Sequence, residues 1–514
     1  MALTTPNSRP WLWIGACAGI LAPRAYLAVT DQGMIWSDEV YQTLEQGHRL
    51  AFGYGLVPWE FKAGARSWLL PGMIGCGMRL LALLGVTSGG WMVVAVKLGF
   101  ALLSALALVA MLRIAQYAAG TAGVLLLGLV GAALPASLLY GSRAMSEVAS
   151  APCLAWALAL LWRFGLGPAG RASEPGSAGW WSGQTVVRLL GAGGLLGLAA
   201  VLRYQVVVLV PVVVLLVAWR GSLAGAVLLA AGAALLIGMG GLLDWLTWGK
   251  PFAAFLAYLR FNLIEHVADR WGVAGRGFYL STLVTTSGPV WLMLAFGFLL
   301  GLPRSWPVAV LAATYIAAHS AVAHKELRFI YPVLPLLLLC SAVGLTQVLD
   351  RLPTPRLRLA GAALLGCAMA GLLIAHARHL TFRDIGQPMD SQANGGPTST
   401  SVWHAFDATN RLIARAGTFA DLCGLAVPAA NPYWTGGYTY FHRRAPLIWA
   451  GGRGDYDAAN YVLLGPGQKM EDARYRRWMG CGSDELYRRE GGCARPSRAN
   501  LGYGRLSPSG IPGS

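Results

Sequence analysis

The sequence predicts a polytopic α-helical membrane protein that carries a small α+β domain after its last span. Three observations predict this class. Of 514 residues, 56% are apolar and only 12% are charged, against roughly 25% charged in average soluble proteins. Apolar runs of about 20 residues, enough to cross a bilayer core of roughly 30 Å, recur through most of the chain. Beyond residue 377 these runs stop, and short mixed segments with turn signals follow.

The apolar runs divide residues 1–376 into about eleven predicted spans. The first run is longer than the apolar core of a signal peptide, and no small-residue cleavage site precedes the polar interval after it. We therefore expect this first span to be retained. The predicted spans are residues 11–30, 91–112, 122–140, 144–162, 189–203, 204–219, 223–243, 286–302, 306–322, 329–349 and 359–376.

Arginines between the apolar runs predict the orientation. The net charge of +17 would be typical of nucleic-acid binding in a soluble protein. Because these arginines flank spans, they favour topology signals and lipid headgroup contacts, and we expect no nucleic-acid partner. The positive-inside rule makes their face cytoplasmic, so the N-terminus is predicted inside and the C-terminal domain outside. The arginines are Arg9, Arg113, Arg163, Arg171, Arg188, Arg220, Arg304, Arg351, Arg356 and Arg358.

The part of the chain after the last span is predicted to be a linker followed by a domain. Residues 377–401 include a stretch rich in Gly, Pro and Ser that is typical of a linker. Residues 402–514 contain the short mixed runs of an α+β domain. Its cysteines are Cys423, Cys481 and Cys493, and an oxidising compartment would allow one disulfide, which we expect between Cys481 and Cys493. No CxxC pair indicates a zinc site.

A polar interval between Trp36 and Arg66 follows the first span and is the first candidate site. It begins with the acidic pair Asp38 and Glu39, and a carboxylate at the membrane boundary can act as general base towards an incoming hydroxyl. A solvated loop is the alternative explanation of two adjacent acids. Aromatic rings and hydrogen-bonding edges nearby, which sugar sites commonly use, favour a site. These neighbours are Tyr41, His48, Trp59 and Trp68.

Residues 324–332 form the second candidate site. Four ionisable side chains, those of His324, Lys325, Glu326 and Arg328, lie between two predicted spans. Charges at a membrane boundary are expensive to bury and indicate function. Lysine binds phosphate as a point charge and arginine as a planar fork. Interfacial anchoring is the alternative, but an anchor needs neither the acid nor the imidazole.

Other polar residues share the predicted outer face. Arg203 ends a span, and Arg143 and Glu147 lie at another turn, where each is equally explained as an anchor or as part of an ion pair. The sequence has no Walker loop, no GxGxxG after a strand and no HExxH, so a nucleotide-sugar donor has no docking motif. A lipid-linked phosphosugar fits better, since its tail can stay in the bilayer while its phosphate and sugar meet the two candidate sites.

The two candidate sites also carry a family resemblance. The first loop, residues 38–60, resembles the opening of the glycosyltransferase family 22 mannosyltransferases. These are GT-C enzymes that use dolichyl-phosphate mannose in the assembly of GPI anchors and dolichol-linked oligosaccharides. Residues 324–332 are similar to that family's best marker, and Phe261-Asn262 stands where the family has a related pair. The resemblance extends to about residue 349, although residues 36–37 are Trp-Ser here where the family has His-Pro.

The resemblance implies a GT-C-like enzyme that transfers mannose, or a similar sugar, with inversion. The implied donor is a polyprenyl-phosphate sugar, the acceptor is a glycan, glycolipid or protein, and the site faces the periplasmic side of the inner (plasma) membrane. No metal or other cofactor is required, because basic side chains can carry the phosphate charge. Two other classes stay open, namely a transporter or flippase of lipid-linked sugars and a membrane anchor that displays the outer domain.

The resemblance also implies roles for individual residues. Asp38 is the general base, and one base suffices for a single displacement, so Glu39 is a second acid of the catalytic pair and need not be a nucleophile. Lys325 and Arg328 stabilise the leaving phosphate. His324 and Glu326 hold that cluster or the sugar, and Arg203 is a further phosphate contact. The remaining substrate contacts are expected from His48, Trp59, Glu60 and Asn262.

Overall fold

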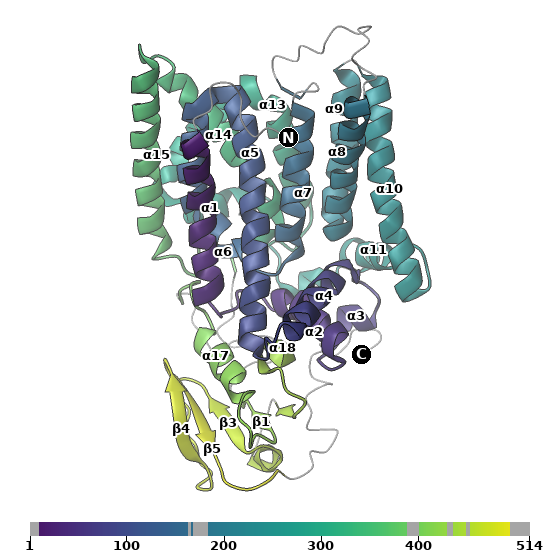
Figure 1. Ribbon diagram of the computed structural model, residues 1–514, viewed down its shortest axis with the longest axis vertical. Helices are drawn as coiled ribbons and strands as arrows, with labels where there is room; N and C mark the ends of the chain where they lie inside the picture. The colour runs from purple at the N-terminus through teal and green to yellow at the C-terminus, as the bar shows by residue number, and fades with distance from the viewer. Residues whose placement is uncertain are drawn as a thin grey trace.

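The computed structural model describes residues 10–162, 166–167, 183–220, 222–387, 400–428, 435–448 and 453–493. A bundle of long helices occupies one end of the molecule and a small sheet the other, with short helices between them (Figure 1). Within the described residues seven segments are long and apolar enough to cross a membrane, or eight if the bent pair α6–α7 is one span. The predicted class, a helical membrane protein with a small C-terminal α+β region, is confirmed.

The long helices form the bundle. They are α1 (Pro10–Thr30), α5 (Gly89–Ala133), α7 (Ser146–Leu161), α8 (Gly183–Leu202), α10 (Leu223–Trp248), α13 (Trp291–Ala321), α14 (Leu334–Leu349) and α15 (Pro355–Ala377). Short helices and helical turns join them. They are η1 (Val40–Leu44), α2 (Glu45–Phe52), α3 (Trp59–Lys62), α4 (Leu69–Leu83), α6 (Pro135–Gly141), η3 (Tyr204–Val208), α9 (Leu209–Trp219), α11 (Ala253–Leu259), η4 (Arg260–Ile264), η5 (Val267–Trp271), α12 (Phe278–Ser287), η6 (Gly288–Val290) and η7 (Leu327–Val333).

The helix boundaries agree with the predicted spans at two points where a single label covers two helices. α5 contains two helices that meet at the non-helical residue Gly120, and α13 contains two that meet at Ser305, so predicted spans 91–112 and 122–140, and 286–302 and 306–322, are separate helical segments. The two parts of α5 pack side by side, since a Cβ at Gly131 would lie 3.4 Å from the Leu108 side chain. α4 was not predicted, because 15 residues are too few to span a bilayer. Together with α2, α3 and α11 it lies between the bundle and the sheet (Figure 1).

Glycines allow the helices of the bundle to approach closely. A Cβ at Gly344 of α14 would lie 1.8 Å from the carbonyl oxygen of Gly297 on α13, and one at Gly193 of α8 would lie 2.0 Å from that of Leu229 on α10. Close packing of small residues is a main source of helix association in a membrane, where apolar side chains gain little by leaving lipid.

A buried arginine repairs the break between α5 and α6. Pro135 has no N–H, so the carbonyl of Gly131 loses its helical donor. Arg24 of α1 donates from Nη2 to that carbonyl at 3.0 Å and to the hydroxyl of Ser137 at 2.7 Å. α6 and α7 then meet at 115°, which brings the turn between them to the same end of the bundle as the first loop (Figure 1).

Basic residues of the predicted cytoplasmic loops gather at the other end of the bundle. Arg220 donates to the carbonyl of Gly167 at 3.2 Å, and Arg304 and Arg358 contact the carboxylate of Asp350 at 3.5 and 3.9 Å. These contacts join the ends of α7, α9, α14 and α15 to the kink of α13. The alternation of the loops between two faces is therefore present in the fold, and the orientation relative to the cell stays a prediction.

The C-terminal region contains a five-stranded mixed sheet of order β2-β1-β3-β5-β4. β1 is parallel to β2 and β3, whereas β5 is antiparallel to β3 and β4. Its elements are α17 (Asp407–Ala416), β1 (Leu425–Ala426), α18 (Gly437–Phe441), β2 (Leu447–Ile448), η9 (Arg453–Ala458), β3 (Tyr461–Leu464), β4 (Arg476–Cys481) and β5 (Asp484–Arg488).

The disulfide predicted between Cys481 and Cys493 is wrong. The bond joins Cys423 and Cys493, whose Cα atoms are 5.8 Å apart, and Cys481 is free. The sheet explains the pairing. Cys481 pairs with Asp484 at the tip of the β4–β5 hairpin, whereas Cys493 follows the far end of β5. Since β5 runs opposite to β1 and β3, that far end lies beside the start of β1, which Cys423 precedes.

The C-terminal region is packed onto the end of the bundle where the first loop lies. α18 contacts α2 and α5, and α17 contacts α5. The carboxylate of Glu45 accepts hydrogen bonds from the backbone and hydroxyl of Thr439, at 2.8 and 2.7 Å, and so caps the first turn of α18. The predicted boundaries of this domain stay predictions, and most of the predicted linker 377–401, residues 388–399, lies outside the described residues.

Candidate functional site

A pocket of about 600 Å³, including its open mouth, lies where the first loop meets α4, the end of α8, α11 and η7. The apolar part of its lining, the apolar wall, comes from α4 and the last turn of α8. Its residues are Leu69, Leu70, Pro71, Val201 and Leu202. The other walls are polar and carry three guanidinium groups and two carboxylates. These residues are Asp38, Gln42, Arg66, Ser146, Glu147, Arg203, Gln205, Tyr258 and Arg328.

Asp38 and Arg328, 290 positions apart in the chain, meet in this pocket. Arg328 donates from Nη2 to Asp38 Oδ2 at 2.7 Å. Its Nε donates to Glu326 at 2.6 Å, and its Nη1 lies 3.5 Å from Glu147. The guanidinium is thus held among three carboxylates. Asp38, with 22% of its side chain exposed, is the most open member of this cluster, so its carboxylate faces the pocket in a fixed orientation.

Arg203 lies directly after α8, beside the same cluster. Its Nη1 contacts Glu147 at 3.1 Å, and its guanidinium carbon lies 5.0 Å from the centre of the Phe329 ring. Within the described part of the chain, its Nε and Nη2 have no hydrogen-bond partner although the side chain is only 6% exposed. Arg203 therefore brings an unsatisfied buried cation to the pocket.

His324 supports Glu326. Its Nδ1 contacts the carbonyl of Gly272 at 2.7 Å and its Nε2 contacts Glu326 at 2.9 Å, which suits a ring that is protonated on both nitrogens. Burial alone would lower the pKa of His324, but the hydrogen bond and charge of Glu326 raise it. Burial alone would raise the pKa of Glu326, but Arg328 and then His324 lower it to about 2. Both shifts therefore favour the charged forms of the two side chains.

Lys325 turns to the backbone instead of the pocket. Its ammonium donates to the carbonyls of Ala274 at 2.7 Å, Ala323 at 3.3 Å and Val322. Burial and the charge of Arg276 lower the pKa of Lys325. Its three N–H groups thus tie the end of α13 to the loop before α12.

Trp59, Glu60 and Asn262 lie beside the pocket. Glu60 accepts from Gln42, a pocket residue, at 2.9 Å. Burial raises the pKa of Glu60, and the nearby charge of Asp38 adds to the rise. Trp59 stacks on Trp271 with ring centres 5.9 Å apart. Asn262 donates to a backbone carbonyl at 2.9 Å. None of the three lines the pocket itself, but Glu60 and Asn262 contact the lining residues Gln42 and Tyr258.

Glu39 points away from Asp38 into a separate ion network. Arg143 donates to both oxygens of Glu39 at 3.0 Å and to Asp31 at 3.0 Å. Lys97 donates to the backbone carbonyl of Asp31. Burial alone would raise the pKa of Asp31, but Arg143 and Lys97 hold it below its usual range. Glu39 therefore anchors the loop from which Asp38 projects.

His48 faces the C-terminal region. Its Nε2 and the Nδ1 of His442 are 2.9 Å apart, and its other ring nitrogen is 3.2 Å from the carbonyl of Tyr54. Burial, with a smaller effect of His442, lowers the pKa of His48 to about 3. A neutral pair of rings thus joins α2 to the end of α18, away from the pocket.

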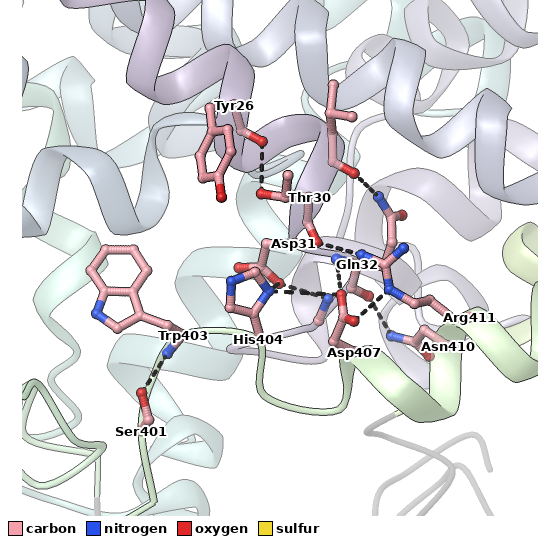
Figure 2. A network of polar contacts seen from close by, with 12 residues as sticks. Tyr26, Thr30, Asp31, Gln32, Ser401, Trp403, His404, Asp407, Asn410 and Arg411 are labelled. Atoms are coloured by element: carbon pink, nitrogen blue, oxygen red, sulfur yellow. Dashed lines mark hydrogen bonds and ion pairs between the residues drawn. The ribbon is translucent and has the colours of Figure 1, made fainter. Parts of the chain in front are cut away.

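Among the described residues one group, Asp31, His404 and Asp407, has the ligand types and spacing of a metal site. Figure 2 shows these side chains where the end of α1 meets α17. The two carboxylates already accept from Arg143 at 3.0 Å and Arg411 at 2.5 Å. Arg143 also pairs with Glu39, and Lys97 adds a third positive charge beside Asp31. Three cations thus face three carboxylates without an ion, and we assign the group to the contact between these segments.

Sequence reasoning missed several pocket residues. Arg66 marks the end of the polar first loop, and Gln205 and Tyr258 fall in intervals with other polar residues, yet nothing in their local pattern separates them from interfacial anchors. Glu147 was open between an anchor and an ion pair, and the structure shows the ion pair, with Arg203 and Arg328.

The chain is similar to known mannosyltransferases. Residues 17–398 match the Alg9-like mannosyltransferase family. The GPI mannosyltransferase 3 of Yarrowia lipolytica is 29% identical over 337 residues, which cover 65% of this chain and 62% of that protein. The Drosophila melanogaster protein of the same name is 29% identical over 327 residues, 62% of this chain and 54% of its own. The alignments thus span less than two thirds of these relatives.

Two solved structures share the fold. ArnT from Cupriavidus metallidurans bound to undecaprenyl phosphate has a TM-score of 0.58 at 12% identity, with 94% of this chain and 99% of that chain covered. The oligosaccharyltransferase AglB from Archaeoglobus fulgidus, in complex with an inhibitory peptide and a dolichol-phosphate, has a TM-score of 0.50 at 12% identity, with 88% and 69% covered. At these identities the likeness concerns the fold alone.

Proposed function

The chain belongs to the Alg9-like mannosyltransferase family, and from this premise we propose that it is an integral-membrane glycosyltransferase. It transfers mannose, or a similar sugar, from a polyprenyl-phosphate carrier to an acceptor hydroxyl. The observation that carries the proposal is the pocket, which combines the oriented carboxylate of Asp38, guanidinium groups and an apolar wall. The occupancy of the ArnT structure by undecaprenyl phosphate supports a lipid-phosphate donor for this fold.

The pocket supplies the groups that an inverting displacement needs. Asp38 accepts the proton of the acceptor hydroxyl. At the same time the hydroxyl oxygen of the acceptor attacks the anomeric carbon from the face opposite the phosphate. The bond between that carbon and the phosphate oxygen breaks, and the electron pair leaves with polyprenyl phosphate. Arg328, at 2.7 Å, orients the Asp38 carboxylate. Guanidinium groups fixed in advance stabilise the charge that develops on the phosphate.

The shape of the pocket suits an amphiphilic donor. The apolar residues Leu69, Leu70 and Leu202 can pack against the first isoprene units, and the polar part of the lining receives the phosphate and sugar. The acceptor, a glycan, glycolipid or protein, approaches from the open mouth. With the basic loops in the cytoplasm, the mouth opens on the periplasmic side of the inner membrane.

The decisive test is to incubate the purified protein with polyprenyl-phosphate mannose and measure the release of polyprenyl phosphate. An enzyme releases it with turnover, and Asp38→Asn binds the donor without releasing it. A transporter or flippase moves the labelled donor across proteoliposomes and leaves the sugar–phosphate bond intact, so absence of cleavage by the wild-type protein over a range of acceptors contradicts the proposal.

A further inference from the structure

The guanidinium of Arg203 has one edge whose two nitrogens are buried and make no hydrogen bond within the described residues. Nε and Nη2 lie along one edge of the planar guanidinium and together form the two-pronged fork that matches two oxygens of a phosphate. In Arg203 these two nitrogens have no hydrogen-bond partner among the described residues, whereas Nη1 is held by Glu147 at 3.1 Å. A buried cation with an unsatisfied fork is costly unless a ligand completes it.

The N–H groups of the two cations in the 324–332 motif, Arg328 and Lys325, are already used in hydrogen bonds. The Nε and Nη2 atoms of Arg328 both donate to Glu326, at 2.6 and 3.2 Å, and Nη2 also donates to Asp38. Lys325 uses its ammonium on three backbone carbonyls and does not line the pocket. A phosphate that bound there would have to displace carboxylates that already neutralise Arg328.

A second available guanidinium, that of Arg66, also lines the pocket. Its one ion pair within the described residues, with Glu60, is long at 3.9 Å, and 26% of its side chain is exposed. Tyr258 also lines the pocket, and its hydroxyl accepts from Gln205, which leaves the hydroxyl proton free to donate. Arg66, Arg203 and Tyr258 thus offer donors from three different segments around the same space.

We propose that the phosphate of the lipid donor is seated by Arg203 and Arg66, with Tyr258 as a third donor, and that Arg328 is a positioning residue for Asp38. This assignment rests on the proposed function, and it deepens that function by separating the phosphate seat from the motif that holds the base. The seat adjoins Val201 and Leu202 of the apolar wall, which follows from the chain itself because Arg203 is the next residue after α8.

The test measures the affinity of the full-length protein for polyprenyl phosphate in detergent, alongside turnover with polyprenyl-phosphate mannose. Arg203→Lys keeps the positive charge beside Glu147 but loses the fork, and Arg66→Gln removes a partly exposed cation. Each raises the Kd for polyprenyl phosphate on the order of tenfold. Arg328→Lys lowers kcat and leaves that Kd within about twofold, because its carboxylate partners stay in place.

Arg260→Gln is the matched control. Arg260 is also paired with a glutamate of its own loop, Glu265, at 2.6 Å, but it is 68% exposed and is not a pocket residue. Its Kd and kcat stay at wild-type values. A competition arm with inorganic phosphate separates the two sources of a phosphate group. If inorganic phosphate displaces polyprenyl phosphate only when it is in large excess, the site is specific for a lipid phosphate. If the two compete equally, the assignment to a lipid phosphate is wrong.

The outcomes separate this inference from the proposed function. If Arg328→Lys or Lys325→Ala weakens binding of polyprenyl phosphate while Arg203→Lys and Arg66→Gln bind as wild type, the seat is the 324–332 motif and the inference is wrong. If the wild-type protein binds polyprenyl phosphate through Arg203 and Arg66 but cleaves no sugar donor, the seat stands and the proposed transfer falls.

Discussion

Two adjacent residues, Asp38 and Glu39, belong to two different ion networks. The pocket network joins Asp38, Arg328, Glu326, Glu147 and Arg203, and the anchor network joins Glu39, Arg143 and Asp31. Both are built from arginines held between carboxylates. The two acids diverge because they lie in one helical turn, where consecutive side chains point about 100° apart.

The difference lies in what each network leaves open. In the anchor network Nε of Arg143 donates to the Leu139 carbonyl at 2.9 Å, and Nη1 also donates to the Gly33 carbonyl at 3.1 Å, so no edge remains for a ligand. In the pocket network Arg203 keeps a free edge, and Asp38 is 22% exposed against 5% for Glu39. Unpaired N–H donors and an exposed carboxylate distinguish the pocket network from the anchor network. The number of charged residues does not distinguish them.

Asp38→Asn has the largest expected effect on the pocket network. Loss of the general base lowers turnover by about 10²- to 10⁴-fold, while the melting temperature changes little because the side chain is partly exposed. The measurement is release of polyprenyl phosphate, with a melting curve of the same preparation. Glu39→Gln is the comparison, since it acts on the melting temperature. Equal loss of turnover by a fully stable Glu39→Gln protein would place Glu39 in the catalytic pair.

Arg143→Met has the largest expected effect on the anchor network. It leaves the buried carboxylates of Glu39 and Asp31 without their cation and lowers stability by about 3–5 kcal/mol, as breaking one side of a buried ion pair does. The measurement is thermal unfolding in detergent. The triple variant that adds Glu39→Gln and Asp31→Asn recovers much of the loss, because no uncompensated charge remains. If the triple variant is no more stable than Arg143→Met, the cause is lost packing and not charge.

The sequence was sufficient for the class, the helical region and the meeting of Asp38 with residues 324–328. Those inferences depended on the length of the apolar runs and on the alternation of loops between the two membrane faces, and both can be read directly from the order of residues in the chain. The roles within the site needed the structure. Whether Lys325 faces a phosphate or backbone carbonyls depends on the path of residues 272–276, about 50 positions away, and the local pattern carries no record of it.

The disulfide shows the same limit. The sequence favoured Cys481 and Cys493 because they are close in the chain. The pairing of Cys423 with Cys493 follows from the order of strands β1, β3 and β5, which the short and mixed segments of this region do not encode in any periodic pattern. The capping of α18 by Glu45 depends likewise on a contact across 394 positions.

The pH dependence of stability should separate the networks. The pKa of His324 is raised, so its stabilising contribution is full below its unfolded pKa near 6.5 and is lost as pH rises through the raised value. The pKa of Asp31 is lowered, so its contribution is present above its ordinary pKa and is lost as pH falls through the lowered value. The melting temperature should therefore fall on both sides of neutrality. On the acid side both networks lose stability, the anchor network through Asp31 and the pocket network through Glu326, whose pKa is also lowered.

Variants assign the two limbs of that profile. His324→Gln removes the alkaline fall and keeps the acid one, and Asp31→Asn reduces the acid fall and keeps the alkaline one. An alkaline fall that persists unchanged in His324→Gln would mean that the pocket network is not its source. The profile is measured as melting temperature between about pH 4 and pH 9, the range that brackets ordinary carboxyl and imidazole titration.

Chelation should have the smallest effect. Asp31, His404 and Asp407 offer a metal the right ligand types (Figure 2). Arg143, Arg411 and Lys97 already balance the carboxylates of Asp31, Glu39 and Asp407, so a divalent ion would add charge to a balanced group. EDTA therefore leaves turnover and melting temperature unchanged. The pair His266 and Asp269 has the same spacing in the chain and no third ligand within the described residues, so His266→Ala controls for surface histidine. The anchor network would be a metal centre if one equivalent of zinc raised the melting temperature of the wild-type protein and of His266→Ala but not that of His404→Ala.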